Sequence, residues 1–246
     1  MRDIVKGRPP TRAEYNKILK VSINRTNKWS IIGKLVIQLM SCAALREIEI
    51  ANLMVQDLVA ANGDLHELFI LDADRTYNGK ERPILLNDDL KKTLEQYLAL
   101  LRSEGVLSSP NRSYLSLMPT ALLIINPLTF KPFGLQKRGV RGDKIAYSST
   151  HLNKFVDGII HSAKLSDVGI TRKSLHRLFL IEAYKSDIGL RDISTISGFS
   201  VDSIKKAIAM DVGQYAPIHE WFTKRDEAAK RRLNRMRQVR KWTFAD

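Results

Sequence analysis

One arginine of the sequence has surroundings that favour phosphate chemistry. Arg46 lies in the apolar stretch ALREIEIANL, residues 44–53, and Glu49 follows it three residues later. A guanidinium presents a planar fork of N–H donors that matches two phosphate oxygens, and such a group stabilises the charge that develops in phosphoryl transfer. The alternative is a helix-surface arginine paired with Glu49, which contributes about 0.3 kcal/mol. Arg46 is therefore the first candidate for a phosphate-binding residue.

The charge balance indicates a polyanionic partner. The 246 residues include 40 Lys and Arg against 26 Asp and Glu, a net charge of +14, which favours nucleic acid or an anionic membrane surface. No stretch of about 18 uncharged apolar residues and no signal peptide is visible, so a membrane is disfavoured. Cys42 is the single cysteine, which excludes an internal disulfide and a zinc site of paired cysteines. We expect a cytoplasmic protein that binds DNA or RNA and has no metal or organic cofactor.

The elements that must position Arg46 are predicted in the order helices, one hairpin, helices. Thr11 and Glu14 form a capping box after a basic tail over residues 1–10. Apolar residues at helical spacing predict a helix over 28–41 that continues through 42–54. Two short apolar runs on either side of DRTYNGK predict a β-hairpin, because Asn-Gly is a strong turn signal. Further helices are predicted over 88–104, 149–165, 171–187, 190–197 and 201–210, and residues 106–148 are predicted to be rich in loops.

This order, together with three sequence blocks, resembles the catalytic domain of the tyrosine recombinase (phage integrase) family. The blocks are ALREIEIANLMVQDL, LDADRTYNGKERPILLNDDL and SLHRLFLIEAYKSDIGLRDISTISGFSVDSIKKAI. The resemblance implies a mainly α fold with a small β-hairpin or sheet, in which Arg46 is the first catalytic arginine and grips the scissile phosphate. It implies a DNA-binding domain over residues 11–218, which a basic segment over 219–246 follows.

The other family positions are degenerate in this sequence. The resemblance puts Lys173 where the family has a histidine, His176 at the second arginine and Phe199 at the histidine of the Gly-His turn. The hairpin lysine falls near Tyr77 or Arg75, with Lys80 as a turn-shifted candidate. Ile208 stands at the position of the nucleophilic tyrosine, and an isoleucine side chain cannot attack phosphorus. The resemblance therefore implies a recombinase fold that binds double-stranded DNA without cutting it, and no catalytic residue is assigned.

Basic and polar side chains near these positions are assigned to DNA contact. Basic groups neutralise phosphates with an affinity that falls with salt, and polar groups at the start of a groove-binding helix contact base edges. The predicted DNA-binding residues are Arg46, Arg75, Lys80, Arg138, Arg141, Lys144, Ser149, Thr150, Asn153, Lys154, Arg172, Lys173, His176, Arg177, Lys230, Arg231 and Arg235. The C-terminal segment holds nine basic residues between Lys224 and Lys241, and either DNA contact or self-association is expected of it.

Other functions stay open from the sequence. Tyr215, seven residues after Ile208, would serve an active recombinase as a displaced nucleophile. Residues 191–208 also match a helix-turn-helix, which would indicate a transcriptional regulator. RNA binding is compatible with the charge, but no aromatic stacking platform of the usual kind is visible. For the preferred DNA-binding function, the sequence does not choose among regulation, replication and partition of a plasmid, phage or other mobile element, in association with the nucleoid or a plasmid.

Overall fold

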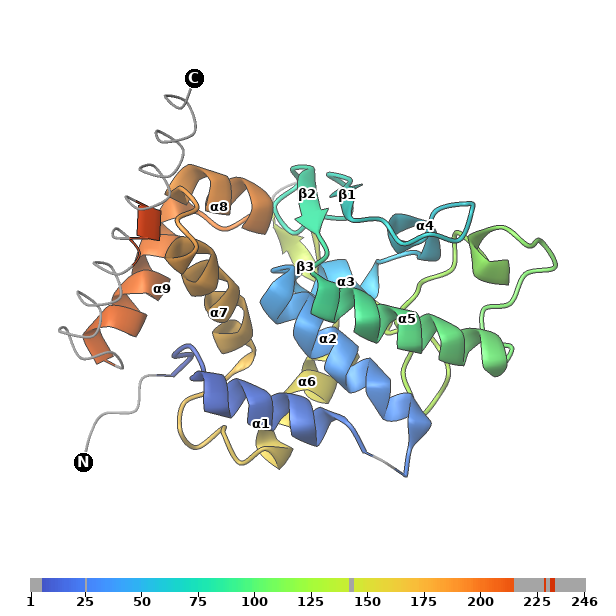
Figure 1. Cartoon of the computed structure of the whole chain (residues 1–246), viewed down its shortest axis with the longest axis horizontal. Coiled ribbons are helices and arrows are strands. Elements are labelled where there is room, and N and C mark those ends of the chain that lie inside the picture. The colour runs from blue at the N-terminus through green and yellow to red at the C-terminus, as the bar shows by residue number, and fades with distance from the viewer. Residues whose placement is uncertain (1–5, 25, 142–143, 215–227, 229–230, 233–246) are drawn as a thin grey trace, which may run out of the picture.

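The computed structural model describes residues 6–24, 26–141, 144–214, 228, 231 and 232 (Figure 1). This part of the chain is mainly helical and contains two antiparallel sheets of two strands each, so the predicted fold class is confirmed. The elements in chain order are α1 (Arg12–Ser22), the 3-10 helix η1 (Lys28–Ser30), α2 (Ile31–Cys42), α3 (Glu47–Ala51), α4 (Val55–Leu58), β1 (Leu68–Leu71), β2 (Arg82–Leu85), α5 (Asp88–Ser103), the 3-10 helix η2 (Tyr114–Ser116), β3 (Gln136–Arg141), β4 (Lys144–Ser148), α6 (Thr150–Ser162), α7 (Arg172–Lys185), α8 (Leu190–Ser197) and α9 (Val201–Gln214).

Helix α2 forms the centre of the larger hydrophobic core. Nearly all of its residues are buried, as expected of a helix that is apolar on every side. It packs against α1, α5, α6 and α7, and Figure 1 shows it running between these helices. A smaller core joins α7, α8 and α9 through Leu180, Ile193, Ile204 and Ala207. The candidate site lies where these two cores meet.

The predicted continuous helix through residues 42–54 is wrong. Helix α2 ends at Cys42, and Ala44 has a φ of +53° in the left-handed region. The carboxylate of Glu49 accepts a hydrogen bond from the Arg46 backbone N–H at 2.8 Å, which satisfies an amide at the start of a new helix. Helix α3 therefore begins at Glu47, and Arg46 lies at a corner of the chain with extended backbone angles.

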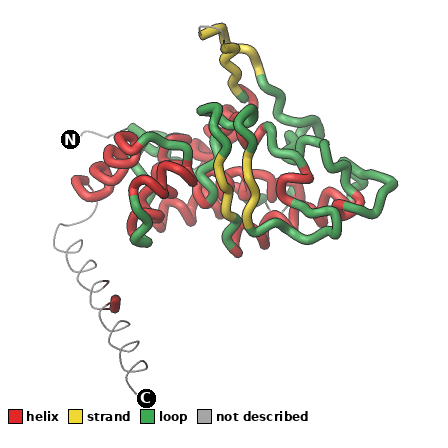
Figure 2. Tube along the Cα trace, turned by 90° about the horizontal axis from the view of Figure 1, so that it is seen from above, coloured by secondary structure: helices red, strands yellow, loops and turns green. Residues whose placement is uncertain are grey.

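The β1–β2 hairpin is confirmed, and its strands pair from Leu68 with Leu85 to Leu71 with Arg82. A second hairpin, β3–β4, lies within the segment predicted as loop-rich, and it projects from the body of the molecule (Figure 2). Its strands have an irregular register between Lys137 and Gly139. The β3 sequence QKRGVR has no alternating apolar pattern, which explains why periodicity does not reveal this strand.

The chain before α1 is anchored from Gly7 onward, although the sequence predicts a tail there. Residues 7–10 are buried. The Gly7 N–H donates to the Gly169 carbonyl at 2.7 Å, and Arg177 donates to the Gly7 carbonyl. Arg8 donates to the Val168 carbonyl at 2.8 Å. These bonds fix the segment against the loop between α6 and α7. The capping box of Thr11 and Glu14 is present, as predicted.

Candidate functional site

The guanidinium of Arg46 lies between two aromatic rings that come from distant parts of the chain. Its Cζ atom is 4.1 Å from the ring centroid of Tyr77, in the loop between β1 and β2, and 4.3 Å from that of Phe199, between α8 and α9. Both distances are typical of cation–π contacts. We call Tyr77, Arg46 and Phe199 the aromatic stack. Burial lowers the pKa of Arg46 against the opposing effect of Glu49, and the group stays charged in the neutral range because the ordinary value is so high.

The edge of the Arg46 guanidinium has few protein partners. Its Nη2 atom lies 3.5 Å from the Gly198 carbonyl, which is a long hydrogen bond. Among the described residues, no carboxylate lies within ion-pair distance of this guanidinium. The two rings contact the guanidinium through cation–π attraction and accept no ordinary hydrogen bond from its five N–H donors. The stack therefore holds a cation whose N–H donors have few partners in the described part of the chain, so that they can serve an oxyanion.

A buried ion pair between Arg82 and Glu49 links the segments that carry the aromatic stack. Arg82 and Glu49 have side chains that are each 2% exposed, and Arg82 Nη2 donates to Glu49 Oε2 at 2.5 Å. Arg82 also donates to the Ala44 carbonyl at 3.2 Å and to the Ile196 carbonyl at 2.7 Å. These bonds join β2 to the start of α3 and to the end of α8. Arg82 therefore ties together the three segments that supply the aromatic stack.

Glu49 fixes the backbone of two members of the stack. Its Oε2 accepts from the Arg46 N–H at 2.8 Å and its Oε1 accepts from the Tyr77 N–H at 3.1 Å. A carboxylate that accepts several such bonds is fully used and its geometry is rigid. The relative position of Arg46 and Tyr77 is thus set by hydrogen bonds that reach the protein interior.

A second charged cluster lies beside the stack and centres on Glu47. Arg172 Nη1 donates to Glu47 Oε1 at 2.8 Å, and His176 Nε2 lies 3.7 Å from Glu47 Oε2. Burial would raise the pKa of Glu47, but the hydrogen bond and charge of His176 and the charge of Arg172 hold this pKa at about 2. The His176 ring is 5.8 Å from the Phe199 ring. Glu47 therefore neutralises basic groups that the sequence assigns to DNA.

Of the positions that the resemblance predicts to be degenerate, Phe199, His176 and Ile208 pack inside the protein, whereas Lys173 does not. Phe199 and Ile208 are half-buried and pack against the smaller core. His176 is buried, and its Nδ1 atom has no hydrogen-bond partner in the described part of the chain. Lys173 is exposed on the first turn of α7. The stack and its neighbours can hold an oxyanion, but neither Phe199 nor Ile208 carries a group that can donate a proton or attack phosphorus.

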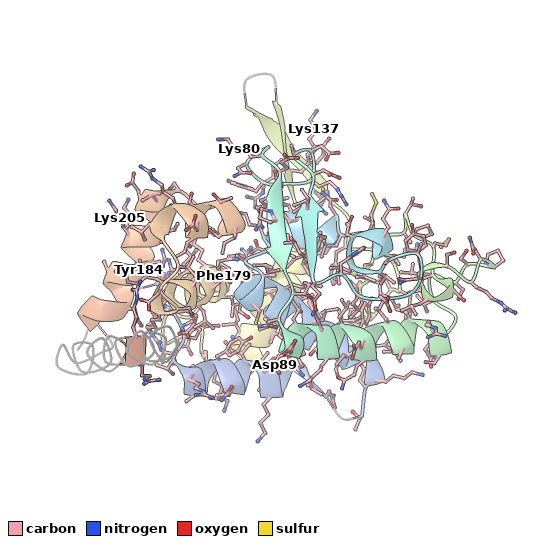
Figure 3. All side chains as sticks on the ribbon, turned by 45° about the horizontal axis from the view of Figure 1, so that its top comes forward. Lys80, Asp89, Lys137, Phe179, Tyr184 and Lys205 are labelled. Carbon is pink, nitrogen blue, oxygen red and sulfur yellow. The ribbon has the colours of Figure 1, made fainter. Side chains whose placement is uncertain are left out.

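The predicted DNA-binding residues divide into exposed cations and internally bonded ones. Lys80, Arg138, Lys154 and Lys173 are exposed, and Figure 3 shows Lys80 and Lys137 on the side of the molecule opposite Asp89. Arg75 is bonded to Asp57 and Asp72 at 2.6 and 2.5 Å. Arg172 also contacts Asp157 at 3.0 Å, and Arg177 donates a hydrogen bond to the Gly7 carbonyl.

The start of α6 is more buried than a base-reading surface requires. Ser149 is fully buried, and its Oγ atom has no hydrogen-bond partner within the described residues. Thr150 and Asn153 are half-buried, and only Lys154 of this group is exposed. Arg231 is exposed. The remaining assignments lie outside the described residues or side chains: Arg141, Lys144, Tyr215, Lys230 and Arg235.

Sequence reasoning did not single out Glu47 and Arg82 as site residues, and it named Tyr77 only as a position near the hairpin lysine of the resembled family. Arg82 lies in the second sequence block, but nothing in its spacing indicates that it bonds to Glu49 and to α8. Tyr77 lies directly before the Asn-Gly pair and looks like an ordinary loop tyrosine. Only the three-dimensional approach of three segments reveals the stack. In the described ranges, no group of three or more His, Cys, Asp or Glu side chains is placed to hold a metal ion, and no helix there is long and apolar enough to cross a membrane.

Comparison with known proteins shows a likeness in structure and not in sequence. No protein-family model and no curated protein matches the sequence. The structure is similar to that of XerA recombinase, with a TM-score of 0.53 and 13% identity over 85% of this chain and 65% of that chain. It is similar to XerH site-specific recombinase bound to palindromic difH substrate, with a TM-score of 0.55 and 15% identity over 83% of this chain and 50% of that chain.

A third similar structure is the Tn1549 transposon integrase in complex with a circular intermediate DNA. The TM-score is 0.57 with 11% identity, over 92% of this chain and 67% of that chain. The chain thus spans about two thirds of the XerA and Tn1549 chains and half of the XerH chain. At such low identities the likeness establishes architecture alone, and the chain has the fold of a tyrosine recombinase catalytic domain.

Proposed function

We propose that this chain binds double-stranded DNA at specific sites, with Arg46 holding a backbone phosphate, and does not cleave the DNA. The observation that carries the proposal is the aromatic stack, which presents the donor edge of Arg46 without a carboxylate partner among the described residues. A phosphate diester has the charge and the paired oxygens that match this edge. Two of the similar structures, XerH and the Tn1549 integrase, contain DNA, which supports DNA as the source of the phosphate.

The charge distribution supports a long polyanion over a small phosphate ligand. The net charge is +14, and the exposed cations Lys80, Arg138, Lys154 and Lys173 come from four different parts of the chain. Neutralising several phosphates at once gives DNA affinity that falls steeply with salt. Specificity for a site would come from contacts to base edges and from DNA shape.

The absence of cleavage is inferred from Phe199 and Ile208. These residues stand where the resembled family has a proton-donating histidine and a nucleophilic tyrosine, and both pack against the smaller core. Without the nucleophile no covalent intermediate forms, because positioning and charge stabilisation cannot replace an attacking group. Loss of the proton donor slows the reaction further, by about 10²–10⁴-fold. We infer a role in regulation, replication or partition of a plasmid, phage or other mobile element.

A gel shift with the full chain tests binding and cleavage together. Fragments of DNA from the genetic neighbourhood of the coding sequence are used at physiological salt with excess competitor, where non-specific complexes dissociate. We expect a discrete shifted band that disappears in detergent. Arg46→Ala should weaken the band, whereas Arg102→Ala should not, because Arg102 is exposed in the last turn of α5. Arg102→Ala removes the same charge.

Two outcomes would contradict the proposal. A protein–DNA band that survives detergent would mean a covalent intermediate and an active recombinase, with Tyr215 as the first residue to replace. The absence of a discrete band on every fragment would contradict the proposal of site-specific DNA binding.

A further inference from the structure

Tyr77 is exposed in a way that its contact with Arg46 does not explain. The side chain is 61% exposed although one side of its ring lies against the guanidinium of Arg46. The exposed area therefore lies on the ring's other face and its edges. A cation–π contact covers only the face of the ring that the cation lies against. The outer face is a flat apolar surface at the end of the aromatic stack.

The loop that carries Tyr77 is held rigidly. The Tyr77 N–H donates to Glu49 at 3.1 Å, and the preceding Thr76 donates from its hydroxyl to the Ala73 carbonyl at 3.0 Å. Arg75 is bonded to Asp57 and to Asp72. A ring fixed in this way loses little conformational entropy when a partner stacks on it. The outer face of Tyr77 is thus preorganised for a flat ligand.

The surroundings of Tyr77 select a nucleotide over another flat ligand. The Arg46 guanidinium, the proposed phosphate-binding group, has its Cζ atom 4.1 Å from the Tyr77 ring centroid. Lys80 is exposed three residues later in the same loop. Within a nucleotide, the base and its phosphate are separated by a single sugar. A base that stacks on Tyr77 would therefore leave its phosphate within reach of Arg46 or Lys80, a combination of aromatic platform and cationic groups typical of unpaired nucleic acid.

We propose that Tyr77 stacks on an unpaired nucleobase of the DNA whose phosphate Arg46 holds. This inference rests on the proposed DNA binding. Bases inside a duplex have both faces covered by their neighbours, so only a base at a bulge, a junction or a melted step offers a free face. The chain would then favour DNA that is opened or distorted at its site over fully paired DNA of the same sequence.

Two labelled DNAs test this inference: a fully paired duplex, and the same duplex with one extra, unpaired 2-aminopurine in one strand. Binding to the full-length chain is measured by anisotropy, and stacking is measured by quenching of the 2-aminopurine fluorescence. We expect tighter binding to the bulged DNA by about ten-fold, since stacking on an aromatic side chain contributes on the order of 1–3 kcal/mol per base, together with quenching. Both DNAs are used at low salt, so that affinity for a particular site is not required.

Variants of Tyr77 distinguish two roles of its ring, stacking on a base and positioning Arg46. Tyr77→Phe should keep the preference and the quenching. Tyr77→Leu and Tyr77→Ala should lose the preference for bulged DNA and the quenching, so that their affinities for the two DNAs become equal. Tyr184→Ala is the matched control, because Tyr184 is an exposed tyrosine on α7 (Figure 3), and it should behave like the unchanged protein.

Each contrary result overturns the inference in a recognisable way. Equal affinity of the unchanged protein for both DNAs, without quenching, removes the stacking role and leaves the proposed function standing. A uniform loss of affinity for both DNAs in Tyr77→Leu means that the ring only positions Arg46. A failure to bind either DNA even at low salt means that the proposed DNA binding itself is wrong.

Discussion

Arg82 and Glu49 form a buried ion pair that determines where Arg46 and Tyr77 lie. Both side chains are 2% exposed, and Glu49 accepts hydrogen bonds from the backbone amides of Arg46 and Tyr77. The pair therefore acts on the site through the backbone and through α8, without contact with a ligand. Replacing one partner leaves an uncompensated charge in the interior, which is much more costly than losing a surface ion pair.

Glu49→Ala or Arg82→Ala should lower the free energy of unfolding by about 3–5 kcal/mol, since either change leaves a buried charge alone. Denaturant unfolding of the purified chain measures this change. Disrupting the exposed ion pair of Lys91 with Glu67 by Glu67→Gln provides the control, and we expect no measurable change there. An equally small effect of Glu49→Ala would show that the pair does not hold the three segments together.

Arg46→Lys should reduce DNA affinity almost as much as Arg46→Ala does. A lysine ammonium keeps the charge but lacks the planar fork and cannot lie between two rings in the same way. In a plot of log affinity against log salt, the slope for Arg46→Ala should become shallower by about one phosphate contact. Neither variant should alter the unfolding transition strongly, since no carboxylate pairs with this guanidinium in the described part of the chain. Unchanged affinity and slope would make Arg46 a purely structural residue.

Glu47 should make folding stability depend on pH in the acid range. Its pKa of about 2 in the folded chain lies below the ordinary value of 4.5, so ionised Glu47 stabilises the fold above about pH 4.5. This stability is lost as the pH falls through the folded value, and it amounts to about 3 kcal/mol. Glu47→Gln should be less stable than the unchanged protein at pH 7, and the difference should shrink toward pH 2.

Urea unfolding between pH 7 and pH 2.5 measures this dependence. Glu182→Gln serves as the comparison, because Glu182 makes only an exposed contact with Lys185 at 3.8 Å. A difference between Glu47→Gln and the unchanged protein that stays constant with pH would contradict the assignment of the low pKa to the cluster around Glu47.

The local structure was predictable wherever one short stretch carries the signal. Helices α5 and α8 follow from apolar periodicity, and the β1–β2 hairpin follows from two apolar runs around Asn-Gly. The break before Arg46 was not predictable, because it depends on Ala44 adopting a left-handed conformation in an apolar stretch that also suits a helix.

The site was predictable in part for a related reason. Arg46 could be singled out by residue type, but its partners Tyr77 and Phe199 are far from it in sequence and meet it only in the folded chain. The assignment of basic residues to DNA depends on which of them find acids nearby, and Arg75 and Arg172 both do. Sequence spacing cannot show such pairing between elements.

Deleting residues 224–246 should flatten the salt dependence of DNA binding. The segment from Lys224 to Lys241 holds nine basic residues, and each phosphate contact that it makes contributes to the slope. Anisotropy at several salt concentrations measures the slope, and light scattering of the same sample measures the oligomeric state. Loss of an oligomer with the slope unchanged would assign the segment to self-association instead.

Gly7→Ala should destabilise the chain more than Gly79→Ala does. Both glycines have a positive φ, +80° for Gly7 and +68° for Gly79, so an alanine at either position costs about 1 kcal/mol of backbone strain. A Cβ atom at Gly7 would lie 2.7 Å from Arg177 Nη1, whereas one at Gly79 has no atom within 4 Å. Gly7→Ala must therefore displace Arg177 from the Gly7 carbonyl and lose about 1 kcal/mol more.

Thermal or denaturant unfolding of both variants isolates the effect of losing the Arg177 bond to the Gly7 carbonyl, because the backbone strain is common to both variants. We expect Gly7→Ala to release the segment before α1 as well, which limited proteolysis near residues 6–10 would detect as faster cleavage than in Gly79→Ala. Equal destabilisation and equal cleavage would mean that the bond from Arg177 does not hold this segment. Arg177 would then be available for DNA contact, as its place in the third sequence block first indicated.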